Sequence, residues 1–465
     1  RRHRVPDHPL VAAPGLAPTA LGALEALGLV RVEPEVPVNA GPVVVRGGTV
    51  LTAAGQRFEP GYVVVEGGRI RAVGEGEPPA VDGAAVVDAT GKFVTPGVID
   101  THSHLGVYPS PGARAHEDGN EATAPTTPGV WAEHSVWPQD PGFELAIAGG
   151  VTSLELLPGS ANLIGGRGVV VRSIPARGGR AMRFPGAPET VKMACGENPK
   201  RVYGEKSGPS TRMGNLRGQR EAFLAAQAYV RSWADYQTRT AETAGKKPKK
   251  MSGPPIKEPD RDLDAETLAG ILSGRFLPQV HCYRADDMLS FLQLSHEFGF
   301  QVRSFHHATE SYKIRDVLAA EGVAASVWAD WWGFKLEAYD AIPEGAAMLA
   351  EAGVRAVIHS DSEVGIQRLN QEAAKAYYAG VNAGIDVGED SALRWITANP
   401  AWVLGIDAET GTLEVGKRGD LVVWDHHPFS VYAHAELVFV DGALRYDRAR
   451  PVVWSDFVLG QEVTP

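Results

Sequence analysis

The sequence predicts an α/β protein with a (β/α)8 TIM-like barrel and a small β-sandwich domain formed by both chain ends. Between residues 97 and 401, short apolar runs alternate with Ala-rich segments of helical periodicity, a pattern typical of parallel strands joined by helical crossovers. About eight such units fit in this stretch, which favours a barrel. On both sides of it, Val-rich runs separated by Gly turns predict β-hairpins.

These patterns divide the chain into an N-terminal extension, a barrel and a sandwich made of two distant segments. The extension carries one short amphipathic helix over 19–30, and a long helical pattern around 201–265 predicts an insertion near the barrel mouth. The Lys/Pro-rich run inside the insertion is expected to be a solvated loop. The predicted boundaries are 1–40 for the extension, 41–96 and 402–465 for the sandwich, and 97–401 for the barrel.

Charge and hydropathy restrict the partners. The formal net charge of −11 argues against nucleic acid or an anionic membrane surface as a partner. No apolar run approaches the roughly 18 residues that a membrane helix needs. A small-molecule substrate is the expected partner, and a homo-oligomer stays open.

The two cysteines, Cys195 and Cys282, exclude a disulfide framework but leave a single bridge open. Cys282 follows His281 in a predicted strand and should point to the opposite side, so it is expected to pack against a helix; Cys195 is also expected to be structural. The chain begins Arg-Arg-His-Arg without Met and carries a leader of 40 residues, which favours an exported or periplasmic protein over a cytoplasmic one.

The stretch "GVIDTHSHLG" (97–106) places two histidines, His102 and His104, one residue apart after an apolar run. Residues two apart in a strand face the same side, so both imidazoles can face the barrel axis at the carboxyl end of the first strand. Imidazole and carboxylate, the groups that bind zinc and similar ions, also end other predicted strands. These are His281 in "LPQVHCY", His306 and His307 in "QVRSFHH", and His359 and Asp361 in "RAVIHSD".

Together, "GVIDTHSH", "HHATE", "HSD" and "ALRWITANPAWVLGIDAETGTLEVGKRGDLVVWD" resemble the amidohydrolase superfamily, nearest its imidazolonepropionase-like and prolidase-like branch. The resemblance covers roughly residues 43–445 and implies a metal-dependent hydrolase with the fold predicted above. It also implies roles for single residues. His102 and His104 match the first-strand ligands, His281 the strand-five ligand and His307 the strand-six ligand, while Asp361 matches the aspartate that holds a metal and serves as general base and then acid.

Two positions of this ligand set stay open. His306 competes with His307 for strand six. For the bridging position, Lys192 in "TVKMACGENPKRVYG" aligns with the lysine that relatives carboxylate to bridge two metals, and Glu197 is the alternative. An unmodified lysine is cationic and would repel divalent ions, so Lys192 could serve only as its carbamate. One or two divalent ions are expected, with zinc favoured.

The expected reaction is attack of metal-activated water on a C–N bond of an amide, dipeptide or cyclic amide. If the protein is an enzyme with another activity, the alternative is a deaminase or cyclic-amide hydrolase of the same superfamily. A catalytically silent binding protein with this fold is the alternative outside the enzymes, and the full set of ligand types argues against it. Candidate substrate contacts are Tyr283, His359, Arg201 and Tyr203.

Overall fold

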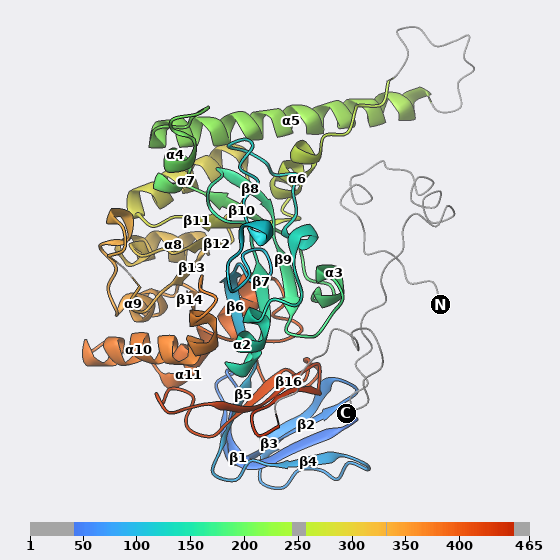
Figure 1. The fold of residues 1–465 in the computed structure, drawn as a ribbon, viewed down its shortest axis with the longest axis vertical. Helices are drawn as coiled ribbons and strands as arrows, with labels where there is room; N and C mark the ends of the chain where they lie inside the picture. The colour runs from blue at the N-terminus through green and yellow to red at the C-terminus, as the bar shows by residue number, and fades with distance from the viewer. Residues whose placement is uncertain (1–40, 244–256, 332, 451–465) are drawn as a thin grey trace.

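The computed structural model describes residues 41–243, 257–331 and 333–450 and has a mixed α/β architecture (Figure 1). Strands from the two ends of the chain form a sheet at one end of the molecule, which we call the chain-end sheet. Strands from the middle of the chain form two further sheets, flanked by helices. The helix predicted over 19–30, most of the Lys/Pro-rich run and the last 15 residues of the predicted sandwich (451–465) lie outside the described residues.

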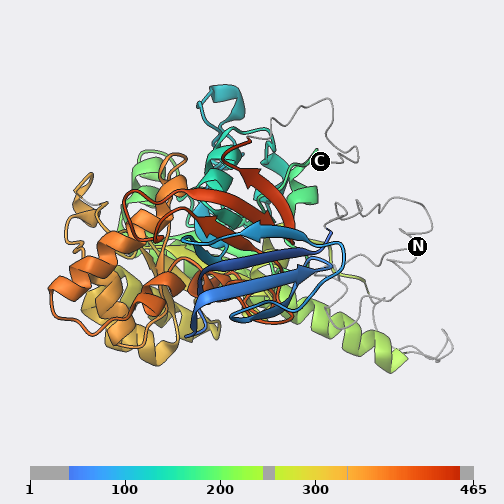
Figure 2. The ribbon, with the colours of Figure 1, turned by 90° about the horizontal axis from the view of Figure 1, so that it is seen from below.

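The chain-end sheet has eight strands in the order β17-β16-β15-β5-β1-β2-β3, with β4 paired to β1. Figure 2 shows its N-terminal strands in blue and its C-terminal strands in red side by side, where β15 pairs antiparallel with β5. Hydrogen bonds join all eight strands, in the region where the sequence predicts a small β-sandwich formed by both chain ends. The strands are β1 (Val43–Leu51), β2 (Arg57–Glu66), β3 (Arg69–Glu75), β4 (Ala85–Asp88), β5 (Phe93–Pro96), β15 (Leu421–Trp424), β16 (Ala435–Val440) and β17 (Ala443–Asp447).

Two hairpins of this sheet have tight turns for a clear local reason. Gly67 and Gly68, between β2 and β3, have φ angles of 60° and 76°. Asp441 and Gly442, between β16 and β17, have φ angles of 53° and 76°. Two consecutive positive φ angles define the type I′ turn, whose twist matches the flanking strands. Glycine reaches this region without steric cost, and aspartate tolerates it better than most residues.

The middle of the chain contributes a three-stranded sheet, β6-β7-β9, and a six-stranded sheet, β14-β13-β12-β11-β10-β8. The pairs from β10 to β14 and the pair β6–β7 are parallel. Their residues are almost all buried, as expected for strands covered on both faces. The strands are β6 (Val98–Ser103), β7 (Val151–Leu156), β8 (Ile164–Arg167), β9 (Val169–Arg172), β10 (Thr190–Ala194), β11 (Leu277–His281), β12 (Ser304–His306), β13 (Ala324–Val327) and β14 (Ala356–Ile358).

Helices connect most of these strands, as the alternating pattern predicts. The α-helices are α2 (Gly142–Ala148), α3 (Gly179–Met182), α7 (Ala285–Phe298), α8 (Arg315–Glu321), α9 (Gly345–Glu351), α10 (Leu369–Asn382), α11 (Glu389–Arg394) and α12 (Ala398–Val403). Short 3-10 turns are η1 (Arg114–His116), η2 (Ala132–Ser135), η4 (Ser311–Ile314), η5 (Leu336–Ala338) and η6 (Gly365–Arg368).

One connection departs from the predicted parallel pattern. Only residues 157–163 separate β7 from β8, too few for the crossover of a dozen or more residues that parallel neighbours need. The segment 164–172 therefore runs antiparallel, with β8 paired to β10 and β9 paired to β7. It links the three-stranded sheet to the six-stranded sheet. On the other side, the Asp361 N–H donates to the His102 carbonyl at 3.0 Å and joins the segment after β14 to β6.

In the region of the predicted insertion, the chain forms α4 (Glu197–Tyr203), α5 (Arg212–Thr243) and α6 (Leu263–Leu272). Figure 1 shows α5 at the end of the molecule opposite the chain-end sheet. Its buried residues, Asn215, Gln219, Phe223 and Ala226, all lie in its first half. Among the described residues no helix is both long and apolar enough to cross a membrane.

The two cysteines form a disulfide, which corrects the expectation that Cys282 packs against a helix. Parallel strands β10 and β11 pair Ala194 with His281. The next residue on each strand is a cysteine, so Cys195 and Cys282 lie opposite each other, with their Cα atoms 5.3 Å apart. The bridge ties together the carboxyl ends of two strands that carry candidate metal ligands.

Candidate metal centre

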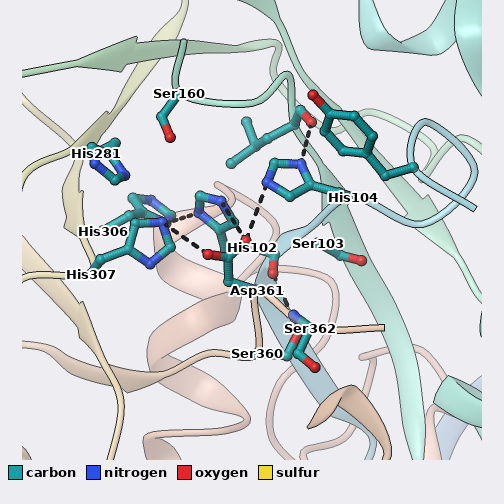
Figure 3. A network of polar contacts seen from close by, with 12 residues as sticks. His102, Ser103, His104, Ser160, His281, His306, His307, Ser360, Asp361 and Ser362 are labelled. Carbon is teal, nitrogen blue, oxygen red and sulfur yellow. Dashed lines mark hydrogen bonds and ion pairs between the residues drawn. The ribbon is translucent and has the colours of Figure 1, made fainter. Parts of the chain in front are cut away.

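Five of the six predicted ligands lie together at the carboxyl ends of the parallel strands in Figure 3, and the sixth, Lys192, contacts one of them, His102. This follows from the fold, because the carboxyl ends of parallel strands meet at one edge, and side chains there converge. The set consists of His102, His104, Lys192, His281, His307 and Asp361, of which His102 and Lys192 are fully buried.

Asp361 stands at the centre of the cluster. Its Oδ1 is 3.2 Å from His104 Nε2 and 3.7 Å from His102 Nε2. Its Oδ2 is 3.6 Å from His307 Nε2. One ligand atom each from His102, His307 and Asp361 lies within 4.8 Å of the others, close enough to share one ion. Three imidazoles therefore direct their Nε2 atoms at one carboxylate.

Lys192 is fully buried and contacts this group through His102, with Nζ 3.2 Å from His102 Nε2. Burial lowers the pKa of Lys192 to about 8, so its amine is less firmly protonated than an exposed lysine. If Lys192 were an ammonium ion, it would repel a divalent cation bound by the neighbouring His102. The position is compatible with a metal only when the amine is neutral or modified.

His281 supplies a ligand atom with no partner. Its Nε2 is 3.3 Å from Asn198 Nδ2, and its Nδ1 is buried without a hydrogen-bond partner among the described residues. Its ring centroid is 4.9 Å from that of His307. An orphaned buried nitrogen is costly unless something binds its lone pair or its proton. The donor set, neutral imidazoles around a carboxylate, is one that zinc prefers, so these residues fit a divalent ion.

Outer contacts fix the direction of the candidate ligands. His306 Nδ1 is 2.9 Å from His102 Nδ1, and His306 Nε2 is 2.8 Å from Gln279 Oε1. His359 Nε2 is 2.7 Å from His307 Nδ1, and the Leu157 carbonyl is 2.8 Å from His104 Nδ1. In each case the Nδ1 of a candidate ligand is engaged, which leaves Nε2 for a metal. His306 thus lies behind His102, while His307 faces Asp361.

Backbone conformation explains how neighbouring residues can both point inward. His307 has φ of 55° and Asp361 has φ of 50°, in the left-handed region that residues other than glycine rarely adopt. Consecutive strand residues face opposite sides, but the turn at His307 brings it to the same side as His306. Such strain, about 1–3 kcal/mol per residue, concentrates at functional sites.

Burial keeps five histidines of this cluster neutral. Burial, reinforced by the charge of Lys192, holds the pKa of His102 and of His281 well below the ordinary value. Burial likewise lowers the pKa of His306 and His307, and brings that of His359 to about 4. Burial alone would raise the pKa of Asp361, but the hydrogen bond and charge of His104 outweigh it and lower that pKa. Neutral imidazoles and an ionised carboxylate are the forms that bind metals.

Two supporting residues are absent from the sequence prediction. Asp100 accepts hydrogen bonds from the backbone N–H groups of His102 and Ser360, both at 3.1 Å, and from the Ser360 hydroxyl, and so ties β6 to the segment that carries Asp361. Gln279 orients His306. Both lie two residues before a predicted ligand, on the same face of its strand, and this spacing was the available signal.

Of the remaining candidate residues, only Tyr283 contacts the predicted ligands directly in the contacts given below. Tyr283 is buried beside the metal centre, with ring centroids 4.7 Å from His281 and 5.7 Å from His307. Arg201 is exposed on α4. Tyr203 differs from the expectation of a substrate contact, because its hydroxyl lies 2.8 Å from the Ala124 carbonyl and 2.9 Å from Asn162 Oδ1, which makes it a structural residue. Glu197 lies with Oε1 3.6 Å from Lys335 Nζ, whereas Lys192 contacts His102.

The chain is similar in sequence to a known protein family and in sequence and fold to a solved structure. The model of the amidohydrolase family matches residues 341–448, a range that includes Asp361 and the strands β15, β16 and β17. The crystal structure of an amidohydrolase from Thermotoga maritima MSB8 is 35% identical in sequence, and the alignment covers 87% of this chain and 100% of that one, with a TM-score of 0.77.

Curated proteins are similar to this chain as well, and two of them align with most of it. Amidohydrolase tasK of Hapsidospora irregularis is 34% identical over 412 residues, or 85% of this chain, and the chain spans 40% of that protein's length. An imidazolonepropionase of Bradyrhizobium sp. (strain BTAi1) is 25% identical, with 82% of this chain and 90% of the relative aligned.

Proposed function

The chain belongs to the amidohydrolase family, and we propose that it is a metal-dependent hydrolase that cleaves an amide C–N bond. The family resemblance carried by the motifs is confirmed by the 35% identical structure, which is aligned over its full length. The observation that carries the proposal is the convergence of three imidazole Nε2 atoms on the Asp361 carboxylate.

The proposed reaction is R–CO–NH–R′ + H2O → R–COO⁻ + R′–NH3⁺. Bound divalent metal would lower the pKa of water and polarise the scissile carbonyl. Asp361 is the general base, since its lowered pKa keeps the carboxylate ionised and able to take a proton from the attacking water. As the C–N bond breaks, Asp361 passes that proton to the leaving nitrogen. His359 and His306 hold the rings of His307 and His102 in place.

We propose further that Lys192 acts as its carbamate, formed from the neutral amine and CO2 with loss of one proton. The modification replaces a cation with an anion beside His102, which removes the repulsion of a metal. A fully buried position and a pKa of about 8 support it. Carbon-13 NMR of protein loaded with labelled bicarbonate and zinc should give a carbamate signal that is lost in Lys192→Arg. If the signal were absent while two metal equivalents were bound, Glu197 would take the bridging role.

The proposal has two further parts. The first is that zinc is the preferred ion, and the second is that the two central sheets close into one barrel. Imidazole and carboxylate ligands suit zinc, although geometry and availability also decide selection. The antiparallel segment 164–172 on one side and the Asp361 to His102 hydrogen bond on the other support closure of the two central sheets into one barrel.

An exported location is supported by the Cys195–Cys282 disulfide, since such bonds persist in oxidising compartments and are rare in the reducing cytosol. Alkylation of the protein in intact cells, followed by mass spectrometry, would test it. Free thiols on the native protein would count against export.

The function is tested with purified, metal-loaded protein. Elemental analysis should find one to two metal equivalents per chain. A panel of N-acyl amino acids, dipeptides and cyclic amides should include compounds whose C–N bond is cleaved, with one carboxylate and one amine formed per turnover. Absence of bound metal after metal-supplemented expression, or no cleavage across the panel, would contradict the proposal.

A further inference from the structure

The segment between β13 and α9 brings a cation to the metal centre. Lys335 Nζ is 3.1 Å from Asn198 Oδ1, and Asn198 Nδ2 is in turn 3.3 Å from His281 Nε2. The same ammonium group lies 4.4 Å from the centroid of the Tyr283 ring. Lys335 is therefore one side chain removed from a candidate ligand, and its side chain is 20% exposed.

The charges around Lys335 leave it able to bind an anion. Lys335 forms a long ion pair with Glu197, whose Oε1 is 3.6 Å from Nζ and whose side chain is 32% exposed, so a substrate carboxylate would share the cation with Glu197 or displace it. An ammonium group has three donors, and Asn198 engages one of them. Glu337 also lies nearby, but Arg212 pairs with it, and Arg201 adds a second positive charge to the neighbourhood of Lys335.

An aromatic surface lies beside this cation. It consists of Tyr283, Trp328 and Phe334, with ring centroids 5.9 Å apart for Trp328 and Phe334 and 6.4 Å apart for Tyr283 and Phe334. Trp328 is buried and stacks on His307 at 4.7 Å. Phe334 is 58% exposed. An exposed ring held against buried aromatics that touch a candidate ligand offers an apolar contact next to the reacting atoms.

We propose that Lys335 binds the carboxylate of the amine half of the substrate, and that the aromatic surface of Tyr283, Trp328 and Phe334 contacts the side chain of that half. The substrate class is then a dipeptide or N-acyl amino acid with a free α-carboxylate and a bulky apolar residue after the scissile bond. This inference rests on the proposed function. The α-carboxylate lies two bonds from the amide nitrogen, which suits a cation one side chain removed from His281.

The simpler role for Lys335 is to tie its segment to α4 through Asn198 and Glu197. The two roles differ in what they predict for substrate charge. A structural tie affects all substrates alike, whereas a carboxylate-binding residue affects only those that carry the carboxylate. The informative quantity is therefore the ratio of kcat/KM for a substrate to that for the same compound with its carboxylate converted to a primary carboxamide.

The experiment compares wild type, Lys335→Met, Lys335→Arg and the control Lys417→Met, using the panel compound that is cleaved fastest and its carboxamide. Lys417 is 17% exposed and paired with Glu414, so the control removes an equally buried cation from the chain-end region. Lys335→Met should lower the ratio roughly tenfold to a hundredfold, mainly through KM, as expected for loss of a charge-assisted hydrogen bond. Lys335→Arg should keep most of the ratio, and Lys417→Met all of it. Equal losses for both compounds in Lys335→Met would overturn the inference.

A binding measurement separates this inference from the proposed function. Calorimetric titration of the zinc-loaded protein with L-phenylalanine and L-phenylalaninamide needs no turnover. Tighter binding of L-phenylalanine, lost in Lys335→Met, would support the carboxylate site even if no panel compound were cleaved. Phe334→Ala should reduce the preference for L-phenylalanine over glycine. Equal affinity of wild type for the acid and the amide would overturn the inference while leaving hydrolysis untouched.

Discussion

Two buried polar clusters differ in how their charges are compensated. Where β9 meets the β16–β17 turn, Asp441 accepts hydrogen bonds from Arg172 Nη1 at 2.7 Å and from Arg418 Nη1 at 2.5 Å. The Arg172 and Asp441 side chains are only 3% and 4% exposed. At the strand ends, by contrast, the metal centre gathers imidazoles and Lys192 around one carboxylate. Both clusters hold buried nitrogens without a hydrogen-bond partner among the described residues, Nε of Arg172 and of Arg418 in the first and Nδ1 of His281 in the second, so the contrast lies in their charges.

This difference in charge compensation indicates a different role for each cluster. Opposite charges alternate in the Arg172–Asp441–Arg418 cluster, so its burial is compensated within the protein. The metal centre instead holds neutral bases with unused lone pairs, which is unfavourable unless a further positive species binds there. The first cluster stabilises the junction between the central sheets and the chain-end sheet. The second holds a group of side chains, His102, His307 and Asp361, that could share one ion.

The largest expected effect is on catalysis at the metal centre. Asp361→Asn removes the proposed general base while keeping shape and volume, so kcat should fall on the order of 10²–10⁴-fold. Steady-state kinetics with the best panel substrate would measure it, and elemental analysis would report how much metal stays bound. A variant that keeps most of its turnover would show that Asp361 is not the base.

The junction cluster should respond in stability. Asp441→Asn leaves two buried arginines without their carboxylate, which should cost about 3–5 kcal/mol in the free energy of unfolding. Asparagine tolerates the positive φ at this position, so the charge is the main change. Urea unfolding would measure the loss. Glu221→Gln is the control, because the exposed Arg217–Glu221 pair on α5 lies outside the cluster and should contribute less than about 1 kcal/mol. Similar losses in both variants would show that the buried carboxylate contributes no more to stability than an exposed one.

Loss of the disulfide should have a smaller effect on stability than loss of the Asp441 charge. It closes a sequence separation of 87 residues, and its loss should cost about 2–4 kcal/mol in the free energy of unfolding. Unfolding of the wild type with and without reductant, compared with the double variant Cys195→Ala/Cys282→Ala, would measure it. The double variant should not respond to reductant. A reductant effect of equal size in that variant would mean that the bond is not its cause.

The smallest expected effect is the contribution of His359 alone to the pH dependence of the metal-free protein. Burial lowers the pKa of His359 from 6.5 to about 4, so between these values the unfolded chain binds a proton that the folded protein does not. The free energy of unfolding should therefore fall as pH decreases through this window, by about 1.4 kcal/mol per pH unit for each such histidine. Urea unfolding in the presence of a chelator at pH 7, 6 and 5 would measure the slope. His359→Asn should reduce the slope, and an unchanged slope would remove His359 as a contributor.

Much of the chemistry was predictable because it depends on short-range patterns. Apolar runs of strand length that end in histidine or aspartate mark the carboxyl ends of strands, where parallel topology makes side chains converge. Gly-Gly and Asp-Gly pairs mark hairpin turns for conformational reasons that act locally. The identities of His102, His104, His281 and Asp361 as strand-end residues, and the family to which they point, came from such patterns alone.

Tertiary structure decided what depends on distant partners or on local backbone strain. The left-handed φ of His307, which lets it face Asp361 beside an inward His306, is not encoded in strand alternation. The Cys195–Cys282 pairing depends on the register of β10 and β11, and the reversal of segment 164–172 on the length of the connection before it. Lys335 reaches the metal centre from a loop whose sequence carries no pattern, because only packing against Asn198 and Tyr283 brings it there.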